Sequence, residues 1–270
     1  MMLFAILFGT VGAGVGSVWL AALLSAAMLA RYTQHMLSLA AGALMATAFL
    51  HLLPEAMEGG ADAHDLFAVL LVGLLFFFLL DKAELWHHGH EHCHHHDHDE
   101  HEHADEHSEK ARQHAHAHAH GGGGWAILAG DSVHAFGDGV LIASAFMADM
   151  HLGVMAALAV LAHEVPHHIG DLVVVQHASG NRRNALIKVT LAGTVTGIGG
   201  LVGYGMVSRF DEVLPYLLVL ASSSFIYVAL ADLIPQLQKR LNLKATVVQV
   251  LWLLAGIAMV MLVRGAWHAH

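Results

Sequence analysis

The chain has 270 residues, of which 56% are hydrophobic and only 13% are charged, and its mean hydropathy is +0.58. Soluble domains carry about 25% charged residues, so this composition excludes an ordinary water-soluble globular protein. The formal net charge of −10 excludes the basic surface that a nucleic-acid partner requires.

Eight apolar segments follow one another along the chain, each near the length of about 20 residues that crosses the hydrocarbon core of a bilayer. The first has no charged residue at its start and is longer than the apolar part of a signal peptide, so we interpret it as a membrane helix. The sequence therefore predicts an all-α integral membrane protein with eight transmembrane helices. They are expected at residues 3–27, 35–56, 65–86, 124–148, 153–178, 184–208, 213–237 and 245–265.

A histidine-rich loop divides these helices into two groups. Residues 1–86 would hold helices 1–3, residues 87–123 the loop, and residues 124–270 helices 4–8. Residues 87–120 contain 15 of the 26 histidines and also Cys93, the single cysteine. Flexible histidine tracts bind transition metals weakly, so we expect a metal buffer or sensor, with a dispensable linker as the alternative. The expected loop ligands are His87, His88, His90, His92, His94, His95, His96 and His98.

The distribution of Lys and Arg predicts the orientation, because cytoplasmic loops are enriched in both residues. With the N-terminus outside, ten of the twelve Lys and Arg residues fall on the cytoplasmic side, and only Arg209 and Arg264 fall outside. Both termini are therefore expected outside the cytoplasm, with the histidine-rich loop inside it. The compact chain favours a bacterial inner membrane as its location.

A weak internal repeat relates helix 2 to helix 7. Residues 50–55 read LHLLPE and residues 231–236 read ADLIPQ. Each has a polar residue, two aliphatic residues, a proline and a second polar residue. Because the predicted topology makes these helices antiparallel, the pair is typical of transporters with two opposed halves and favours an inverted-repeat (3+2+3) bundle.

Ionisable side chains inside membrane helices are costly and indicate function. On helix 4, His134 and Asp138 are four residues apart and share one face. On helix 5, His163, His167 and Asp171 have the same spacing, and the two sets lie at the same depth. Imidazole with carboxylate suits borderline divalent ions such as zinc, and also iron, manganese or cadmium. The same helices also carry Asp131, Glu164 and His168.

Two motifs resemble the ZIP family of divalent-metal transporters. Residues 134–139 read HAFGDG and residues 163–171 read HEVPHHIGD, which is similar to the ZIP subfamily whose fifth helix reads HExPHE followed by IGD. The motifs of helices 2 and 7 are also similar to that family. The resemblance implies a transporter rather than an enzyme. Such a transporter moves Zn2+, and often Fe2+, Mn2+ or Cd2+, through a lipid bilayer toward the cytoplasm. It also implies a homodimer.

The resemblance further implies a ligand set between helices 4 and 5. The primary ligands would be His134, Asp138, His163 and His167. A second metal position would use Glu164 and His168, with His167 bridging the two positions. Three departures from the family pattern remove potential ligands from this second position. Ala135 replaces an asparagine, His168 replaces a glutamate, and Thr196 stands where some members have a carboxylate. We therefore expect a firm primary site and a weak or absent second one.

The expected route passes other polar residues on either side of this site. His51 and Glu55 lie toward the outer end of helix 2 and would line an entrance. Asp171 and Asp232 lie inward of the centre and would line an exit toward the loop. Because protons compete with metal ions for these ligands, uptake should fall as the pH falls.

Three other functions are compatible with these residues. Residues 163–167 match HExxH, the zinc-protease motif in which two histidines bind the metal and the glutamate is the base, although Pro166 is awkward inside a regular helix. A metal exporter would use the same ligands, because a ligand set does not encode direction. A metal sensor would leave the eight-helix pathway without a role.

Overall fold

The computed structural model describes residues 1–24, 26–89, 123–238 and 242–268. Within those ranges the chain forms helices and short turns and contains no strand, which confirms the all-α prediction. In chain order the elements are α1 Met2–Val11, η1 Gly12–Gly16, α2 Ser17–Leu23, α3 Ala26–Thr47, η2 Ala48–Leu52, α4 Leu53–Glu58, α5 Ala63–Gly89, α7 Gly123–Ala148, α8 Met150–Ser179, α9 Arg182–Arg209, η3 Asp211–Val213, α10 Leu214–Gln238 and α11 Leu243–His268.

Eight long passes correspond to the eight predicted segments, with ends shifted by a few residues. The first pass is α1–η1–α2 and the second is α3–η2–α4, so each is interrupted by a π-helical turn. By length and apolar composition, seven of the passes in the described part of the chain are able to cross a membrane. The pass outside that set is α7, which carries Asp131, His134 and Asp138 among its residues.

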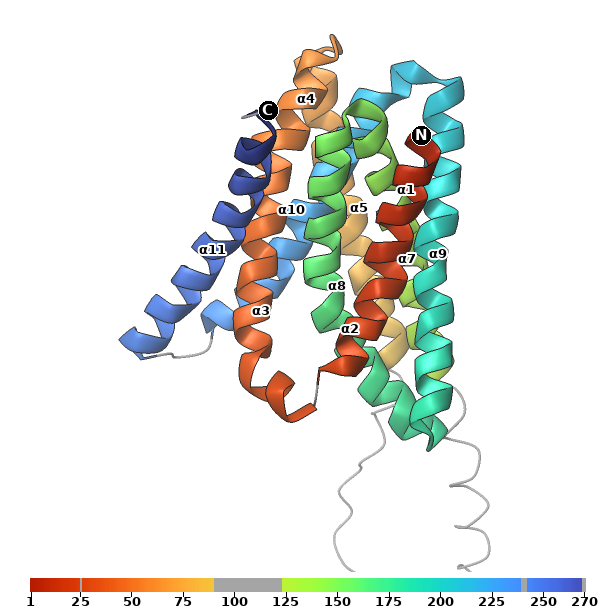
Figure 1. Cartoon of the computed structure of the whole chain (residues 1–270), viewed down its shortest axis with the longest axis vertical. Coiled ribbons are helices and arrows are strands. Elements are labelled where there is room, and N and C mark those ends of the chain that lie inside the picture. Colours follow the sequence, from red (N-terminus) through yellow and green to blue (C-terminus); the bar gives the residue numbers. More distant parts are fainter. Residues whose placement is uncertain (25, 90–122, 239–241, 269–270) are drawn as a thin grey trace, which may run out of the picture.

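The passes alternate in direction within one bundle (Figure 1). α1 begins and α11 ends at one end of the bundle, which we call the terminal end. α5 ends and α7 begins at the opposite end, which we call the loop end. The relative topology predicted from the sequence therefore agrees with the fold. The second pass, whose η2 and α4 carry one half of the weak repeat, runs opposite to α10, which carries the other half.

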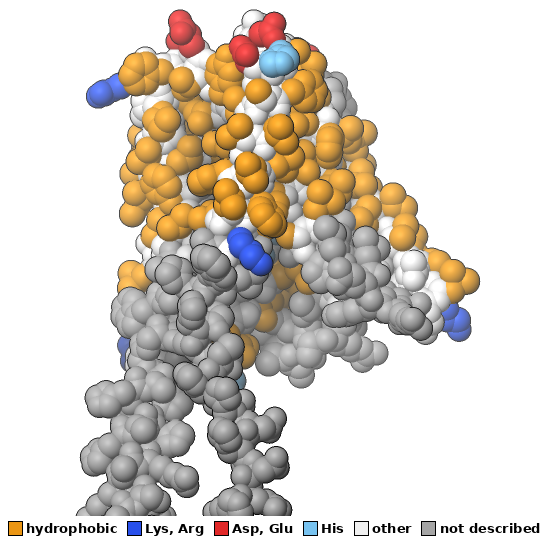
Figure 2. Space-filling view, turned by 180° about the vertical axis from the view of Figure 1, so that it is seen from behind, with side chains coloured by type: hydrophobic (Ala, Val, Ile, Leu, Met, Phe, Trp, Pro, Cys, Tyr) orange, Lys and Arg blue, Asp and Glu red, His pale blue; other side chains and the backbone are white. Residues whose placement is uncertain are grey.

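Apolar side chains cover the outside of the bundle. Large hydrophobic residues project from several passes, including Phe8 on α1, Leu71 on α5 and Leu262 on α11, which are 84%, 68% and 71% exposed. Figure 2 shows such side chains over the flank of the molecule, with acidic side chains gathered at one end. This distribution is what a lipid-facing surface between two aqueous faces requires.

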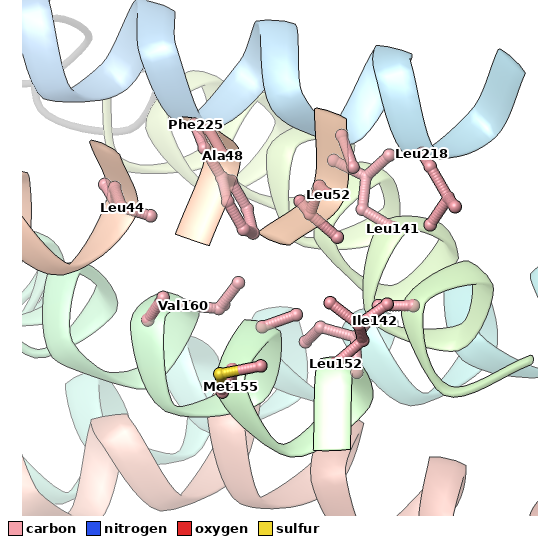
Figure 3. Packing of buried hydrophobic residues seen from close by; sticks show 14 of the residues in the cluster. Leu44, Ala48, Leu52, Leu141, Ile142, Leu152, Met155, Val160, Leu218 and Phe225 are labelled. Carbon is pink, nitrogen blue, oxygen red and sulfur yellow. The ribbon is translucent and has the colours of Figure 1, made fainter. Parts of the chain in front are cut away.

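The largest hydrophobic core lies between the centre and the terminal end. It joins Leu44 and Leu52 of the second pass to Ile142 of α7, Val160 of α8 and Phe225 of α10, all fully or almost fully buried. Figure 3 shows these side chains converging from four passes. A smaller cluster lies toward the loop end and consists of Val18, Leu128, Val175, Ala185, Val189 and Ala192.

Glycines bring α7 against α9 at close range. A Cβ atom added at Gly139 would collide with the backbone carbonyl of Thr196, and one added at Gly199 would collide with that of Phe136. Small residues allow membrane helices to approach in this way, since lipid tails provide no hydrophobic drive for helix association. The contact fixes α7, one of the two helices with predicted ligands, against α9.

Candidate metal centre

A one-residue connection joins the two helices that carry the predicted ligands. α7 ends at Ala148, α8 begins at Met150, and Asp149 between them caps α8. The Asp149 carboxylate accepts hydrogen bonds from the backbone N–H groups of His151 and Leu152 at 2.8 and 3.2 Å. Burial acts to raise the pKa of Asp149, but these hydrogen bonds outweigh it and hold the pKa below its usual range. So short a turn makes α7 and α8 antiparallel neighbours.

Four side chains of α7 and α8 bring one ligand atom each to a common point; we call His134, Asp138, His163 and Glu164 the four-residue group. His134 Nε2 lies 3.5 Å from His163 Nε2, 3.7 Å from Asp138 Oδ2 and 3.6 Å from Glu164 Oε1. His163 Nε2 lies 3.5 Å from Asp138 Oδ2 and 3.2 Å from Glu164 Oε1. Ligands about 2.0 Å from a tetrahedral zinc ion are about 3.3 Å apart. Five of the six edges between these four atoms therefore fit a zinc-sized ion at the centre.

The four-residue group is buried and its charge is unbalanced without a cation. Asp138, His163 and Glu164 are only 2%, 1% and 3% exposed. In the described part of the chain, Asp138 Oδ2 and Glu164 Oε1 have no hydrogen-bond partner. Burying carboxylates without compensation is costly, and a divalent cation would offset both charges while leaving the imidazoles neutral.

A backbone contact favours the tautomer of His163 that a metal ligand needs. Its Nδ1 lies 3.4 Å from the carbonyl oxygen of Ala159, one turn earlier on α8. Because a carbonyl only accepts hydrogen bonds, this contact favours the hydrogen on Nδ1, and Nε2 of the neutral ring then presents its lone pair to the group. Orientation of ligating histidines through the second ring nitrogen is common at metal sites.

A second group shares Glu164 with the first; we call Asp131, Glu164 and His168 the three-residue group. His168 Nε2 lies 3.2 Å from Glu164 Oε2 and 4.0 Å from Asp131 Oδ1. Glu164 thus directs Oε1 to one group and Oε2 to the other. The two groups could hold two adjacent ions with this carboxylate between them, whereas the sequence assigned the bridging role to His167.

His167 lies beside the four-residue group rather than within it. Its ring centroid is 6.3 Å from that of His134 and 5.9 Å from that of His163, and its side chain is exposed. Glu164 occupies the fourth corner that the sequence had assigned to His167. Glu164 is buried beside His163 between the two helices, whereas the side chain of His167 is exposed.

The structure places the other predicted residues as follows. His51 is buried within η2, and Glu55 lies partly buried on α4 at the terminal end. Asp171 is partly buried on α8, one turn beyond His167 toward the loop end. Thr196 packs against Gly14 and Gly139 rather than joining either group. The side chains of Asp232, His87 and His88, and the whole of His90, His92, His94, His95, His96 and His98, lie outside the described residues.

Two residues take part that the sequence did not assign. Asp131 lies seven residues, or two helical turns, before Asp138, and this spacing could have indicated that the two share one face of α7. Ser17, on the first pass, places its Oγ 2.8 Å from His168 Nδ1. Nothing in the sequence pairs a serine of the first pass with a histidine 151 residues later.

Comparison with known proteins yields one family. A family model described as ZIP zinc transporter matches residues 1–264. Zinc transporter foi of Drosophila melanogaster is 31% identical over 140 residues, which are 52% of this chain and 20% of that protein. Zinc transporter ZIP4 of Homo sapiens is 36% identical over 115 residues, which are 43% of this chain and 18% of that protein. Zinc transporter ZIP13 of Pongo abelii is 26% identical over 249 residues, which are 86% of this chain and 66% of that protein.

Proposed function

We propose that this chain, which belongs to the ZIP zinc transporter family, carries divalent metal ions across a membrane through the centre between α7 and α8. Zinc is the first substrate we propose, with Cd2+, Fe2+ and Mn2+ as further candidates. The chain spans about a fifth of the length of the fly and human relatives, at 20% and 18%. Its own substrate, direction and partners are therefore stated here as proposals.

The observation that carries the proposal is the near-tetrahedral arrangement in the four-residue group. Two imidazole nitrogens and two carboxylate oxygens are separated by 3.2 to 3.7 Å along the five edges given above. This set suits a borderline divalent ion and contains no thiolate that would favour a soft one. The three-residue group alongside offers a second position for the ion to move to.

The same geometry disfavours a metalloprotease. In an HExxH site both histidines bind the metal, and the glutamate stays off the metal to act on a water molecule. Here Glu164 occupies a corner of the four-residue group, while the ring of His167 lies to one side. Membership in a family of transporters points the same way.

The proposed direction is from the terminal end to the loop end. His51 and Glu55 would receive the ion, the two groups would hold it, and Asp171 and Asp232 would lead it toward the histidine-rich loop. The Lys and Arg distribution supports a cytoplasmic loop end, and that orientation makes this route an import route. Export would use the same residues in reverse.

Zinc uptake into sealed vesicles tests the proposal. We expect saturable inward flux with the intact chain and its loss in His163→Ala at equal membrane content. His177→Ala is the matched control, since His177 is an exposed histidine on the same helix, and its flux should be unchanged. Inward flux that persists in His163→Ala would remove the four-residue group from the route. Outward flux alone would replace import with export.

A further inference from the structure

Ser17 connects the first membrane pass to the three-residue group. It follows directly after the π-helical turn η1, and both Ser17 and His168 are fully buried at 0% exposure. Its Oγ lies 2.8 Å from His168 Nδ1, the ring nitrogen that faces away from Glu164 and Asp131. A residue of one pass thus contacts a candidate ligand on another.

A second contact of Ser17 determines which atom donates this hydrogen bond. Ser17 Oγ also lies 2.7 Å from the carbonyl oxygen of Gly14. A hydroxyl has one hydrogen to donate and a carbonyl only accepts, so the hydroxyl hydrogen goes to Gly14. Ser17 Oγ must then accept from His168, which places the hydrogen of His168 on Nδ1.

The other nitrogen of His168 therefore presents a lone pair to two carboxylates. His168 Nε2 lies 3.2 Å from Glu164 Oε2 and 4.0 Å from Asp131 Oδ1. Within the residues that the structure describes, Nε2 has no hydrogen-bond partner. Three acceptor atoms that face one another in a buried site repel unless a cation lies between them.

Close backbone packing fixes Ser17 in place. A Cβ atom added at Gly14 would collide with the Gly193 carbonyl and the Thr196 side chain of α9. Gly14, whose carbonyl takes the Ser17 hydrogen, is therefore held against α9. The acceptor oxygen offered to His168 is held by the backbone of two passes, which favours one ring orientation.

We propose that Ser17 is a positioning residue for a divalent metal ion in the three-residue group. Its hydroxyl accepts the Nδ1 hydrogen of His168 and so presents Nε2 to the ion together with Glu164 and Asp131. The inference rests on the proposed function, in which this group binds the transported metal. Mutation of a residue that orients a metal-bound histidine in this way typically lowers metal affinity by about 10- to 100-fold.

Zinc affinity of the purified full-length chain tests this role, measured by competition with a chromophoric chelator. We expect Ser17→Ala to weaken binding by about 10- to 100-fold. Combined with His168→Ala, the Ser17→Ala change should have no further effect, because Ser17 acts through His168. The histidine-rich loop is the same in every variant, so any zinc that it would bind contributes equally to the measurements that are compared.

Ser222→Ala is the matched control. Ser222 is also fully buried, and its hydroxyl bonds to the Leu218 carbonyl one turn earlier on α10 at 2.9 Å. The Ser222→Ala variant loses a buried hydroxyl, as Ser17→Ala does, but this hydroxyl bonds to a backbone carbonyl and not to a candidate ligand. The zinc affinity of Ser222→Ala should therefore match that of the intact chain. An equal loss in Ser222→Ala and Ser17→Ala would reduce Ser17 to a packing residue and overturn the proposal.

Imidazole 15N NMR of the metal-free chain gives an independent readout, with His168 assigned from the difference to His168→Ala. We expect the hydrogen on Nδ1 in the intact chain and a mixture of tautomers in Ser17→Ala. A hydrogen on Nε2 in the intact chain, or unchanged affinity in Ser17→Ala, would overturn the proposal. Absence of zinc flux in the intact chain would count against the proposed transport. The zinc affinity and the His168 tautomer would still test the role of Ser17.

Discussion

The two halves of the bundle differ in what separates the candidate metal centre from the ends of the molecule. Toward the terminal end lies the large hydrophobic core, in which Leu52, Ile142, Val160 and Phe225 come from four passes (Figure 3). Toward the loop end, among the residues whose side chains the structure describes, lies the smaller cluster around Val189. His167 is exposed and Asp171 partly exposed on that side of the four-residue group.

The large hydrophobic core stands between the terminal end and the four-residue group. A hydrated divalent ion cannot pass through a close-packed apolar core without separating its helices, because such cores leave few voids larger than a water molecule. An ion from the terminal end therefore cannot reach the four-residue group in this conformation. On the loop side, polar side chains continue from His167 to Asp171. The predictions below test this contrast, in order of expected size.

The largest effect is expected in the terminal-side core. Phe225→Ala should lower the free energy of unfolding by about 3–5 kcal/mol, because it removes a fully buried ring and leaves a cavity. Thermal unfolding in detergent would measure the loss. Phe76→Ala is the control, since that ring is 53% exposed, and it should change stability by less than about 0.5 kcal/mol. Equal losses would show that the core does not stabilise the terminal side.

The next effect concerns the carboxylate that the two groups share. Glu164→Gln should reduce zinc uptake by more than the roughly 100-fold upper figure for residues that only orient a ligand. The reason is that it removes charge from both groups at once. His168→Gln should cost less, because it alters the three-residue group alone. Uptake assays at equal membrane content compare them, and a larger loss in His168→Gln would contradict the sharing of Glu164.

A paired glycine substitution tests how α7 is held. Gly139→Ala should destabilise the chain by about 1–3 kcal/mol, since its Cβ meets backbone rather than a movable side chain. Gly137→Ala, two residues earlier on the same helix, meets no atom within 4 Å and should be neutral or slightly stabilising. Melting temperatures would separate the two, and equal values would contradict the α7–α9 contact described above.

Proton competition should be visible in uptake. At fixed subsaturating zinc, we expect the rate to fall about tenfold between neutral pH and about pH 5, because protons and metal compete for imidazole and carboxylate. Higher zinc should restore the rate at low pH. A flat profile, or a loss that zinc does not reverse, would mean that protonation acts elsewhere than at the metal centre.

The smallest effect is expected at the turn between α7 and α8. Asp149→Ala removes the cap of α8 and should cost about 1 kcal/mol, whereas Asp149→Asn keeps an acceptor and should cost less. The pKa of Asp149 is lower in the fold than in the unfolded chain, so its contribution is present above the unfolded pKa. That contribution is lost as the pH falls through the folded value. Thermal unfolding of the intact chain and Asp149→Ala should therefore converge in acid.

The sequence by itself determined the all-α class, the eight passes, their alternating order and the helix pair that carries the candidate metal ligands. These follow from the length of the apolar segments and from the cost of ionisable groups in a membrane, both of which are local properties of the chain. It also indicated three of the four residues in the four-residue group, since i, i+4 spacing on one helix is fixed by helix geometry.

Only the tertiary structure decided which side chains meet. Helical spacing says that His163 and His167 share a face, but the rotation of α8 against α7 turns Glu164 inward and leaves His167 outside the group. Asp131 of α7 meets Glu164 and His168 of α8, and Ser17 of the first pass contacts His168, because these passes pack together there. Such contacts depend on how helices distant in sequence are rotated and spaced, and glycines at Gly14 and Gly139 set that spacing through backbone contacts.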